Sequence, residues 1–160
     1  MTNSITLSIL EENMRFLPLL MLSLVVLTST AQAQTPVAGF IKTLEGSGQI
    51  VRAEATMPAR VGDALHVSDA VTTEEKSSIG IMLEDDTILS LGPNSRLELA
   101  DFAFAPQEEN FAVAIRLIKG SFTYMSGVIA RLAPEKIRIE TPDAVIAVHG
   151  TSFLIKVEEK

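Results

Sequence analysis

The sequence predicts an all-β fold of about a dozen short strands, either a compact sandwich or roll or a short β-helix. Short runs of alternating apolar and polar residues recur along the chain, and turn residues separate them at intervals of about 8–10 residues. No amphipathic helix of ordinary length lies between these runs, which argues against a βαβ fold. Regular short strands favour a sandwich or roll, whereas glycines at the corners would equally suit a β-helix.

Composition fits one small domain and excludes several classes of function. The chain has 160 residues, no cysteine and a formal net charge of −7. The negative charge argues against binding to nucleic acid or to anionic lipid. Without cysteine there is no disulfide, thiolate metal site, cysteine nucleophile or lipid-bearing cysteine. With no Trp and Tyr124 as the one tyrosine, an aromatic platform for sugars or bases is not evident.

Residues 1–33 are predicted to be a signal peptide. Residues 16–27 form an apolar run that is too short for the roughly 20 residues needed to span a bilayer. The run is followed by Ala31-Gln32-Ala33, a small-x-small pattern that predicts cleavage after Ala33. An uncleaved anchor or a buried helix is the alternative, and Pro18 argues against it.

The start of this segment is irregular because Glu11 and Glu12 stand where positive charge is usual. Met14 followed by Arg15 would give a more typical start, so translation beginning at Met14 is an alternative. After cleavage the product is expected to be soluble in the periplasm or outside the cell, with no membrane span.

The predicted mature chain has a flexible leader at 34–38, a β domain at 39–157 and a solvated tail at 158–160. Residues 39–45 and 49–53 are predicted to form a hairpin around the turn at 46–48. Residues 54–60 are ambiguous, and 126–134 is the one weak helical segment, closed by Pro134. The further predicted strands are 70–73, 78–83, 87–91, 96–104, 111–118, 121–125, 136–140, 144–148 and 153–157.

Turn chemistry separates these strands and predicts residues with a structural role. Gly-Asp, Gly-Pro-Asn and Thr-Pro sequences favour turns, and glycine permits sharp corners. The run 139–157 is the clearest case, because it reads as strand, proline turn, strand, Gly-Thr break and strand. The structural turn residues are expected to be Gly62, Asp63, Gly92, Pro93, Asn94, Gly120, Thr141, Pro142, Gly150 and Thr151.

No catalytic, cofactor-binding or metal-binding residues are predicted. His66 and His149 are the two histidines; His66 is expected to be exposed in a turn, and His149 to end a strand. No serine lies on a G-x-S-x-G elbow. The acids of Glu84-Asp85-Asp86 are consecutive and suit a solvated hairpin tip, whereas a calcium loop places ligands at alternate positions. Gly46-Ser47-Gly48 lacks the third glycine of a phosphate-binding loop.

An ordered set of short motifs resembles the FecR domain, a β-rich extracytoplasmic module of bacterial envelope proteins. The resemblance covers about residues 39–157. The motifs are Gly48-Gln49-Ile50, Val61-Gly62-Asp63-Ala64-Leu65, Ala70-Val71-Thr72-Thr73, the run from Ser78 to Thr87, Leu91-Gly92-Pro93-Asn94-Ser95, Leu117-Ile118-Lys119-Gly120-Ser121-Phe122, and Thr141-Pro142 through Gly150-Thr151-Ser152-Phe153.

The chain departs from the family pattern at two positions. Asp86 stands where the family usually has Gly, and His149 stands where it often has Arg. Family members that regulate iron-uptake sigma factors also carry a cytoplasmic segment, a membrane span and a receptor-contacting region. These parts are not expected here, so the resemblance implies the module without sigma-factor control.

The resemblance and the composition together lead to a functional expectation. The protein is expected to be an exported, non-enzymatic domain that binds an unidentified envelope or extracellular protein, for sensing or assembly. Short strands with exposed edges offer a place where a partner segment can add to the sheet. Binding of a glycan or a small ligand is the alternative, and an enzyme is a third.

Overall fold

Alternating burial along the chain defines a molecule made almost entirely of strands. The computed structural model describes residues 36–148 and 152–157, all of which belong to the unit Thr35–Lys160. The elements are β1 (Val37–Glu45), β2 (Gly48–Arg52), β3 (Ala55–Pro58), β4 (Ala64–His66), β5 (Ala70–Thr73), β6 (Ser78–Leu83), β7 (Ile88–Leu91), β8 (Arg96–Ala105), η1 (Pro106–Glu108), β9 (Asn110–Met125), α2 (Ile129–Leu132), η2 (Pro134–Lys136), β10 (Ile137–Glu140), β11 (Val145–Ala147) and β12 (Ser152–Val157).

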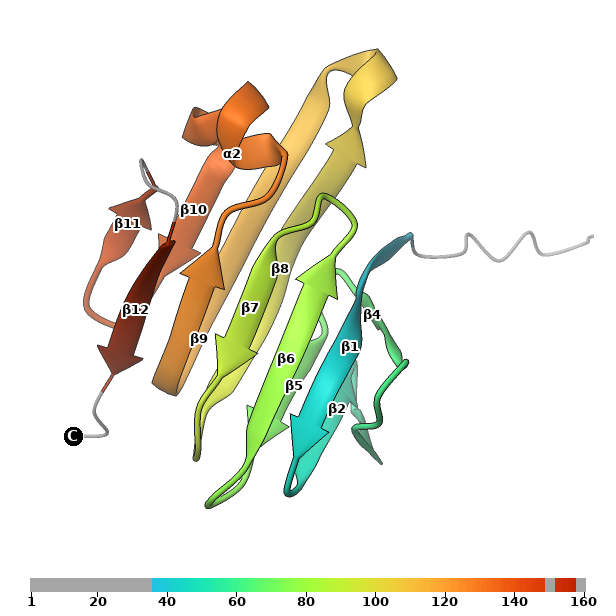
Figure 1. Cartoon of the computed structure of the whole chain (residues 1–160), viewed down its shortest axis with the longest axis vertical. Helices are drawn as coiled ribbons and strands as arrows, with labels where there is room; N and C mark the ends of the chain where they lie inside the picture. Colours follow the sequence, from blue (N-terminus) through green and yellow to red (C-terminus); the bar gives the residue numbers. More distant parts are fainter. Residues whose placement is uncertain (1–35, 149–151, 158–160) are drawn as a thin grey trace, which may run out of the picture. The chain divides into compact units, whose positions relative to one another are not determined.

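Hydrogen bonding joins the twelve strands into one curled sheet, whose two layers face each other (Figure 1). Layer A contains β4, β1, β6, β7, the C-terminal half of β9 and β12, in that order. Layer B contains β3, β2, β5, β8, the N-terminal half of β9, β10 and β11. The predicted all-β fold is confirmed. Its ladders are antiparallel except between β9 and β10, as suits the sandwich or roll alternative.

The core lies between the layers because each strand turns alternate side chains inward. In β6 the buried residues are Ile79, Ile81 and Leu83, while the residues between them are half-buried on the outer face. Layer B contributes residues such as Leu97 and Ile115, which belong to the same hydrophobic cluster. Burying one such side chain stabilises the fold by about 1.5–3 kcal/mol.

β9 is the strand that belongs to both layers. Its N-terminal half pairs with β8 and β10, and its C-terminal half pairs with β7 and β12. Figure 1 shows it bending at its lower end and passing between the layers. The bend lies at Gly120, where φ is +86°. Two separate strands were predicted on either side of Lys119-Gly120, but hydrogen bonding continues through the corner, so they form one bent element.

Four segments carry the chain from one layer to the other at the same end of the sheet. They are residues 46–47, 74–77, 92–95 and 120–121, and together we call them the crossing stack. Each is hydrogen-bonded to its neighbour. The N–H of Glu74 donates to the carbonyl of Ser47 (3.1 Å), and the N–H of Asn94 donates to that of Glu74 (3.2 Å). The N–H of Gly92 donates to the carbonyl of Ser121 (2.9 Å). β1 is thus joined to β2, β5 to β6 and β7 to β8 across the layers.

Buried hydroxyl groups complete the crossing stack. Ser95 is 1% exposed, and its hydroxyl accepts from the N–H of Ser121 (2.9 Å) and donates to the Ser121 carbonyl (3.0 Å). Thr73 donates its hydroxyl to the Gly92 carbonyl (2.6 Å) and accepts from the Ser95 N–H (2.9 Å). Ser77 accepts from the Ser47 N–H at 2.9 Å. Backbone groups that would otherwise be buried without partners are therefore satisfied.

The predicted hairpin of residues 39–45 and 49–53 is wrong. β1 pairs with β4 and β6 in layer A, whereas β2 pairs with β3 and β5 in layer B. The Gly46-Ser47 turn has the composition of a hairpin turn, but its polar groups bond to residues 74–77 instead of across the turn. Ile41 and Ile50, both fully buried, consequently reach the core from opposite layers.

Other predicted elements are found with small shifts in their bounds. The ambiguous segment 54–60 contains β3, and the weak helical segment 126–134 contains α2, with η2 beginning at Pro134. β1 begins at Val37, before the expected start at Gly39, and Ala38 is buried. The run 139–157 contains β10, β11 and β12 in the predicted order. The predicted signal peptide and tail lie outside the described residues.

Gly120 offers a direct test of the bend in β9. A Cβ there would lie 2.5 Å from the Cα of Ser95, in addition to the strain of a left-handed backbone. We expect Gly120→Val to lower the free energy of unfolding by about 2–4 kcal/mol, measured by urea denaturation. Gly62→Ala is the matched control, because Gly62 also has a positive φ (+94°) but nothing within 4 Å. It should cost only about 1 kcal/mol, and equal losses would contradict the proposed packing.

Candidate functional site

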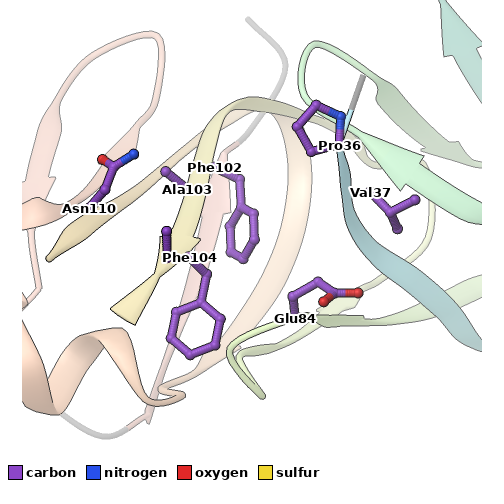
Figure 2. A pocket seen from close by; sticks show the side chains of 8 residues that line it. Pro36, Val37, Glu84, Phe102, Ala103, Phe104 and Asn110 are labelled. Carbon is purple, nitrogen blue, oxygen red and sulfur yellow. The ribbon is translucent and has the colours of Figure 1, made fainter. Parts of the chain in front are cut away.

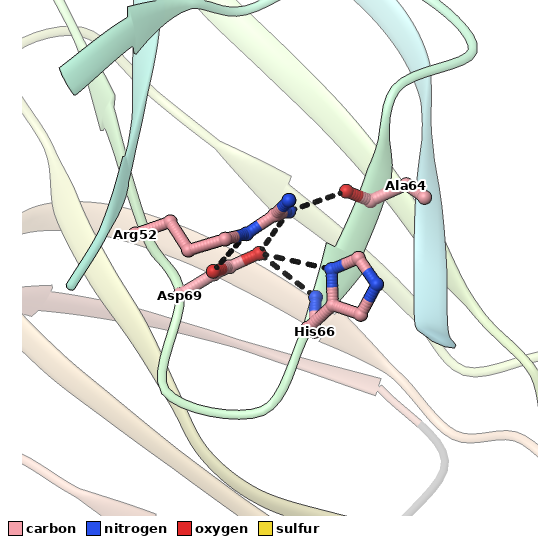
Figure 3. Close-up of polar contacts among 4 residues, drawn as sticks. All are labelled: Arg52, Ala64, His66 and Asp69. Atoms are coloured by element: carbon pink, nitrogen blue, oxygen red, sulfur yellow. Dashed lines mark hydrogen bonds and ion pairs between the residues drawn. The ribbon is translucent and has the colours of Figure 1, made fainter. Parts of the chain in front are cut away.

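An ion pair between Arg52, whose side chain is 38% exposed, and the buried Asp69 joins three strands at the end of β2. The guanidinium of Arg52 donates from Nε to Oδ1 of Asp69 (2.8 Å) and from Nη2 to Oδ2 (2.7 Å), as Figure 3 shows. Nη2 also donates to the carbonyl of Ala64 (2.9 Å), and the N–H of His66 donates to Oδ2 of Asp69 (2.8 Å). The pair therefore fixes β2, β4 and the start of β5 together.

The electrostatics of this pair favour the charged forms. The side chain of Asp69 is 2% exposed, and burial alone would raise its pKa. Hydrogen bonds from Arg52 and from the His66 backbone outweigh burial, so the pKa of Asp69 is lowered. The hydrogen bond to Asp69 raises the pKa of Arg52. Asp69 is thus a permanently ionised structural carboxylate at neutral pH.

His66 lies beside this pair without the geometry of a catalytic base. Its Nδ1 is 3.7 Å from Oδ2 of Asp69 and has no hydrogen-bond partner among the described residues. Both oxygens of Asp69 are engaged by Arg52, so the carboxylate does not orient the imidazole as a triad acid would. The side chain is 21% exposed, less than the sequence led us to expect. The other histidine, His149, lies outside the described residues.

The acidic segment 84–86 is a correction to the sequence analysis, because its middle residue is buried. Asp85 is 0% exposed, whereas Glu84 and Asp86 are exposed. Oδ1 of Asp85 accepts from the N–H of Thr87 (3.1 Å), and Oδ2 accepts from the Thr87 hydroxyl (2.9 Å) and the N–H of Ile129 (3.3 Å). Asp85 therefore holds the β6–β7 turn against the start of α2.

Gly127 permits this contact. A Cβ on Gly127 would meet the backbone of both Asp85 and Thr87 and would approach Oδ2 of Asp85 at 2.8 Å. The N–H of Gly127 donates to the Thr87 hydroxyl (3.2 Å), and the N–H of Val128 donates to the Asp85 carbonyl (2.7 Å). Neither the burial of Asp85 nor its contact with Gly127 was predicted from the sequence. Their spacing of 42 positions along the chain gave no local signal.

The predicted turn residues fall into separate turns and do not form one site. Gly92, Pro93, Asn94 and Gly120 lie in or beside the crossing stack. Gly62 and Asp63 lie before β4, where Oδ2 of Asp63 accepts from the N–H of Arg60 (2.9 Å). Thr141 and Pro142 lie in the β10–β11 turn, where the Thr141 hydroxyl accepts from the N–H of Ala144 (3.1 Å). Gly150 and Thr151 lie outside the described residues.

A cleft of about 370 Å³ opens beside the start of β1. Figure 2 shows the rings of Phe102 and Phe104 from β8 on one side, with Glu84 and Val37 across from them. Phe104 also contacts Phe111 of β9, with ring centroids 6.2 Å apart. An apolar cleft with a single carboxylate at its rim has the composition of a small-ligand or peptide-side-chain pocket.

The outer face of layer A carries an exposed apolar row, which we define as Phe40, Met82, Ile88 and Met125. Phe40 is paired with Met82, Met82 with Ile88, and Ile88 with Met125, so the four side chains lie next to one another across β1, β6, β7 and β9. Ile88 is 38% exposed and Met125 is 48% exposed. Met82 and Phe40 are half-buried.

A second row on the same face consists of uncharged residues, four small and one large. It runs through Thr43, Gly80, Ser90, Thr123 and finally the large Leu154, each paired with the next. Leu154 of β12 is 69% exposed. The outward positions of β6, β7 and the C-terminal half of β9 contain no charged residue. Protein interfaces are likewise depleted in charge and enriched in methionine and aromatic side chains at their centre.

The outer face of layer B has the opposite character. Arg116 of β9 forms ion pairs with Glu98 of β8 (3.3 Å) and Glu140 of β10 (3.0 Å), in a row across three strands. The hydrogen bond to Glu140 raises the pKa of Arg116, and the charge of Glu98 adds to this. Such exposed pairs contribute little to stability, but they keep this face charged and solvated. The two faces therefore differ in what they can bind.

The apolar row was missed at the sequence level although its signal was present. Met82, Ile88 and Met125 occupy strand positions whose neighbours point inward, so these residues must point outward. An apolar residue at an outward position is the signal of a contact surface. What the sequence did not provide is the register that places the residues in one row.

The described residues contain neither a cluster of metal ligands nor a membrane-spanning helix. Residues 36–148 and 152–157 contain no group of three His, Cys, Asp or Glu side chains that would hold a metal ion. Over the same residues, no helix has the length and hydropathy required to cross a bilayer.

Comparisons with known proteins give one match. The family model described as FecR protein matches residues 69–160, more than half of the chain. The resemblance motifs from Ala70 onward lie in this range, whereas those around Gly48 and Gly62 precede it. No curated protein and no solved structure matches the chain.

The Arg52–Asp69 pair predicts a specific dependence of stability on pH. The pKa of Asp69 is lower in the folded state than in the unfolded state. Its contribution to the free energy of unfolding is therefore present above the unfolded pKa of about 3.9 and is lost as the pH falls through the folded pKa. We expect Asp69→Asn to lower the free energy of unfolding near pH 7 by about 1.5–3 kcal/mol. The difference from the wild type should shrink below about pH 4.

Urea unfolding between pH 3 and pH 8 measures this difference. Asp101→Asn is the control, since it removes the same charge from an exposed position on β8. A gap between wild type and Asp69→Asn that stays constant down to pH 3 would contradict the assignment of the lowered pKa to this pair.

Proposed function

Because the chain belongs to the FecR protein family, we propose that it is an exported, non-enzymatic domain that binds another protein of the bacterial cell envelope, in sensing or assembly. Membership of this family supports an envelope role related to signalling. The two buried carboxylates support a non-enzymatic role, because Asp69 and Asp85 accept hydrogen bonds from groups that hold strands and turns in place.

The observation that carries this proposal is the outer face of β6, β7 and the C-terminal half of β9, whose outward positions contain no charged residue. The apolar row spans four neighbouring strands, and rows of hydroxyl and small side chains continue from it. Adjacent outward positions of a rigid sheet hold these side chains at fixed spacing, so binding requires little ordering. The partner surface that fits is itself apolar and uncharged at its centre. An anionic membrane fits poorly, because the chain has a net charge of −7.

A small ligand in the cleft beside Phe102 and Phe104 is the second candidate function. The observation in its favour is that the fold gathers two aromatic rings, Val37 and the carboxylate of Glu84 around about 370 Å³. This grouping is not visible in the sequence, because Val37 and Phe104 belong to opposite layers. An amphipathic ligand with a cationic group would suit the cleft.

Export predicts a defined mature N-terminus. We propose that the chain is cleaved after Ala33, and we expect the protein recovered from the envelope or medium to begin at Gln34. Intact-mass measurement together with N-terminal sequencing checks this. Ala33→Asp, which replaces the small residue before the cleavage position, should leave the longer precursor. Recovery of an unprocessed chain from the cytoplasm would contradict the proposal.

The binding face predicts where a partner attaches. A photo-crosslinking residue placed at Ile88 or Met125 should capture one defined envelope protein, identified by mass spectrometry. That protein, once purified, should bind Met125→Glu at least about tenfold more weakly than the wild type. The reason is that a buried, unpaired charge would be placed at the centre of the interface.

Val145→Glu is the matched control, because Val145 is 68% exposed on β11 of the other layer. It should bind like the wild type. Equal loss in both variants would contradict the assignment of the site to layer A. Loss of binding in Phe104→Ala and Glu84→Gln, with Met125→Glu unaffected, would instead support the cleft.

A further inference from the structure

β12 leaves one edge of layer A open. Among the described residues it pairs only with β9, from Ser152 opposite Met125 to Val157 opposite Gly120. An unpaired edge presents a row of backbone N–H and C=O groups that another strand can bind. Leu154 lies in the middle of this edge strand and is the most exposed large apolar residue described, at 69%.

The other edge strands are protected in ways that β12 is not. β4 and β11 are three residues long, and β3 is four residues long and ends at Pro58. Short strands and proline both discourage pairing between molecules. β12 has six residues and no proline, and Lys156 is its only charged residue.

β12 is also held firmly enough to act as a template. The ring of Phe153 stacks on that of Tyr124, with centroids 5.0 Å apart and an interplanar angle of 15°. Phe153, Ile155 and Val157 pack against the core. Their alternates, Ser152, Leu154 and Lys156, point outward. A second strand at this edge would therefore meet a preformed ladder with two distinct faces.

We propose that β12 pairs with β12 of a second copy of this chain, antiparallel and about a two-fold axis at Leu154. Directly opposed residues in an antiparallel pair point to the same face, so Leu154 lies opposite Leu154, Phe153 opposite Ile155, and Ser152 opposite Lys156. A two-fold axis makes such a contact self-complementary. This register opposes no like charges and pairs each lysine with a serine.

Neighbouring registers that keep the same faces together are less favourable. Within the described residues of β12, an axis at Phe153 would pair only 152–154 of each strand. An axis at Ile155 would place the charged Lys156 opposite Leu154. A second copy is favoured over an unrelated strand because the sequence of β12 is complementary to itself in the Leu154 register.

The dimer joins layer A of both copies into one sheet with both outer faces on the same side. The apolar rows of the two copies would then lie on one continuous surface. Five paired residues on each strand form a small contact beside the roughly 800 Å² per partner of a standard interface, so we expect a dissociation constant in the micromolar range. This inference does not depend on the proposed function, since it concerns the edge of the sheet instead of its face.

Sedimentation of the full exported protein over about 1–200 µM tests the dimer. Leu154→Glu and Leu154→Lys each place like charges opposite one another across the axis, and each should be monomeric over this range. An equimolar mixture of the two variants should restore a dimer, because glutamate then lies opposite lysine. Leu154 is mostly exposed, so both variants should keep the wild-type circular dichroism spectrum and melting temperature. Val145→Glu should still form a dimer.

Cysteine variants test the register, because the chain has no cysteine of its own. Leu154→Cys should form an intermolecular disulfide on mild oxidation, since opposed Cα atoms in such a pair lie about 4.5–5.5 Å apart. Ser152→Cys should not cross-link to itself but should cross-link to Lys156→Cys in a mixture. A monomeric wild type at about 200 µM, a dimer that survives both charged variants, or equal self-cross-linking at 152 and 154 would each overturn the proposal.

Discussion

The hydrogen bonds of the crossing stack are the constraint on which the rest of the structure depends. At the four crossings of the stack, backbone groups lie beside the end of the core, and those that water does not reach need partners. Thr73, Ser77 and Ser95 supply them through buried hydroxyls, and neighbouring crossings supply the remainder. Since the crossings are bonded to one another, each strand of layer A lies opposite a fixed strand of layer B. The facing layers and the bend in β9 follow from this arrangement.

Most strands could be predicted from the sequence, because a half-buried strand shows its period of two directly. Which strands pair with one another was harder to predict. Gly46-Ser47 has the composition of a hairpin turn. It instead passes from one layer to the other, because Ser47 is hydrogen-bonded to Ser77 and Glu74, which are distant in sequence. The burial of Asp85 could not be predicted from its neighbours in sequence either. An acidic turn is usually solvated, and Asp85 is buried because the distant Gly127 packs beside it. Turn-forming residue types stand out in the sequence, but the candidate binding surface required the registers of β6, β7 and β9.

The two outer faces show how one alternating pattern can serve different purposes. In layer B the outward positions carry Glu98, Arg116 and Glu140, which keep that face in water. In layer A the corresponding positions carry the apolar row and small hydroxyl residues. The outward side chains of both layers lie outside the core, so packing of the core does not determine which residues stand there. In the proposed function, layer A would contact the partner while the charged face of layer B stays in water.

The pairing of β1 with β6 has a consequence for how the domain acquires its structure. Gly39 is hydrogen-bonded alongside Leu83, and β9 receives its last neighbour only when β12 is available. Hairpins such as β6–β7 and β8–β9 can form early, but the pairings of β1 with β6 and of β9 with β12 require most of the chain. Topologies rich in such distant pairings fold in milliseconds to seconds. A chain of this kind stays incompletely folded for longer than one built from local hairpins alone. Such a delay would suit the proposed export, because an unfolded chain passes through a narrow channel more readily than a folded one.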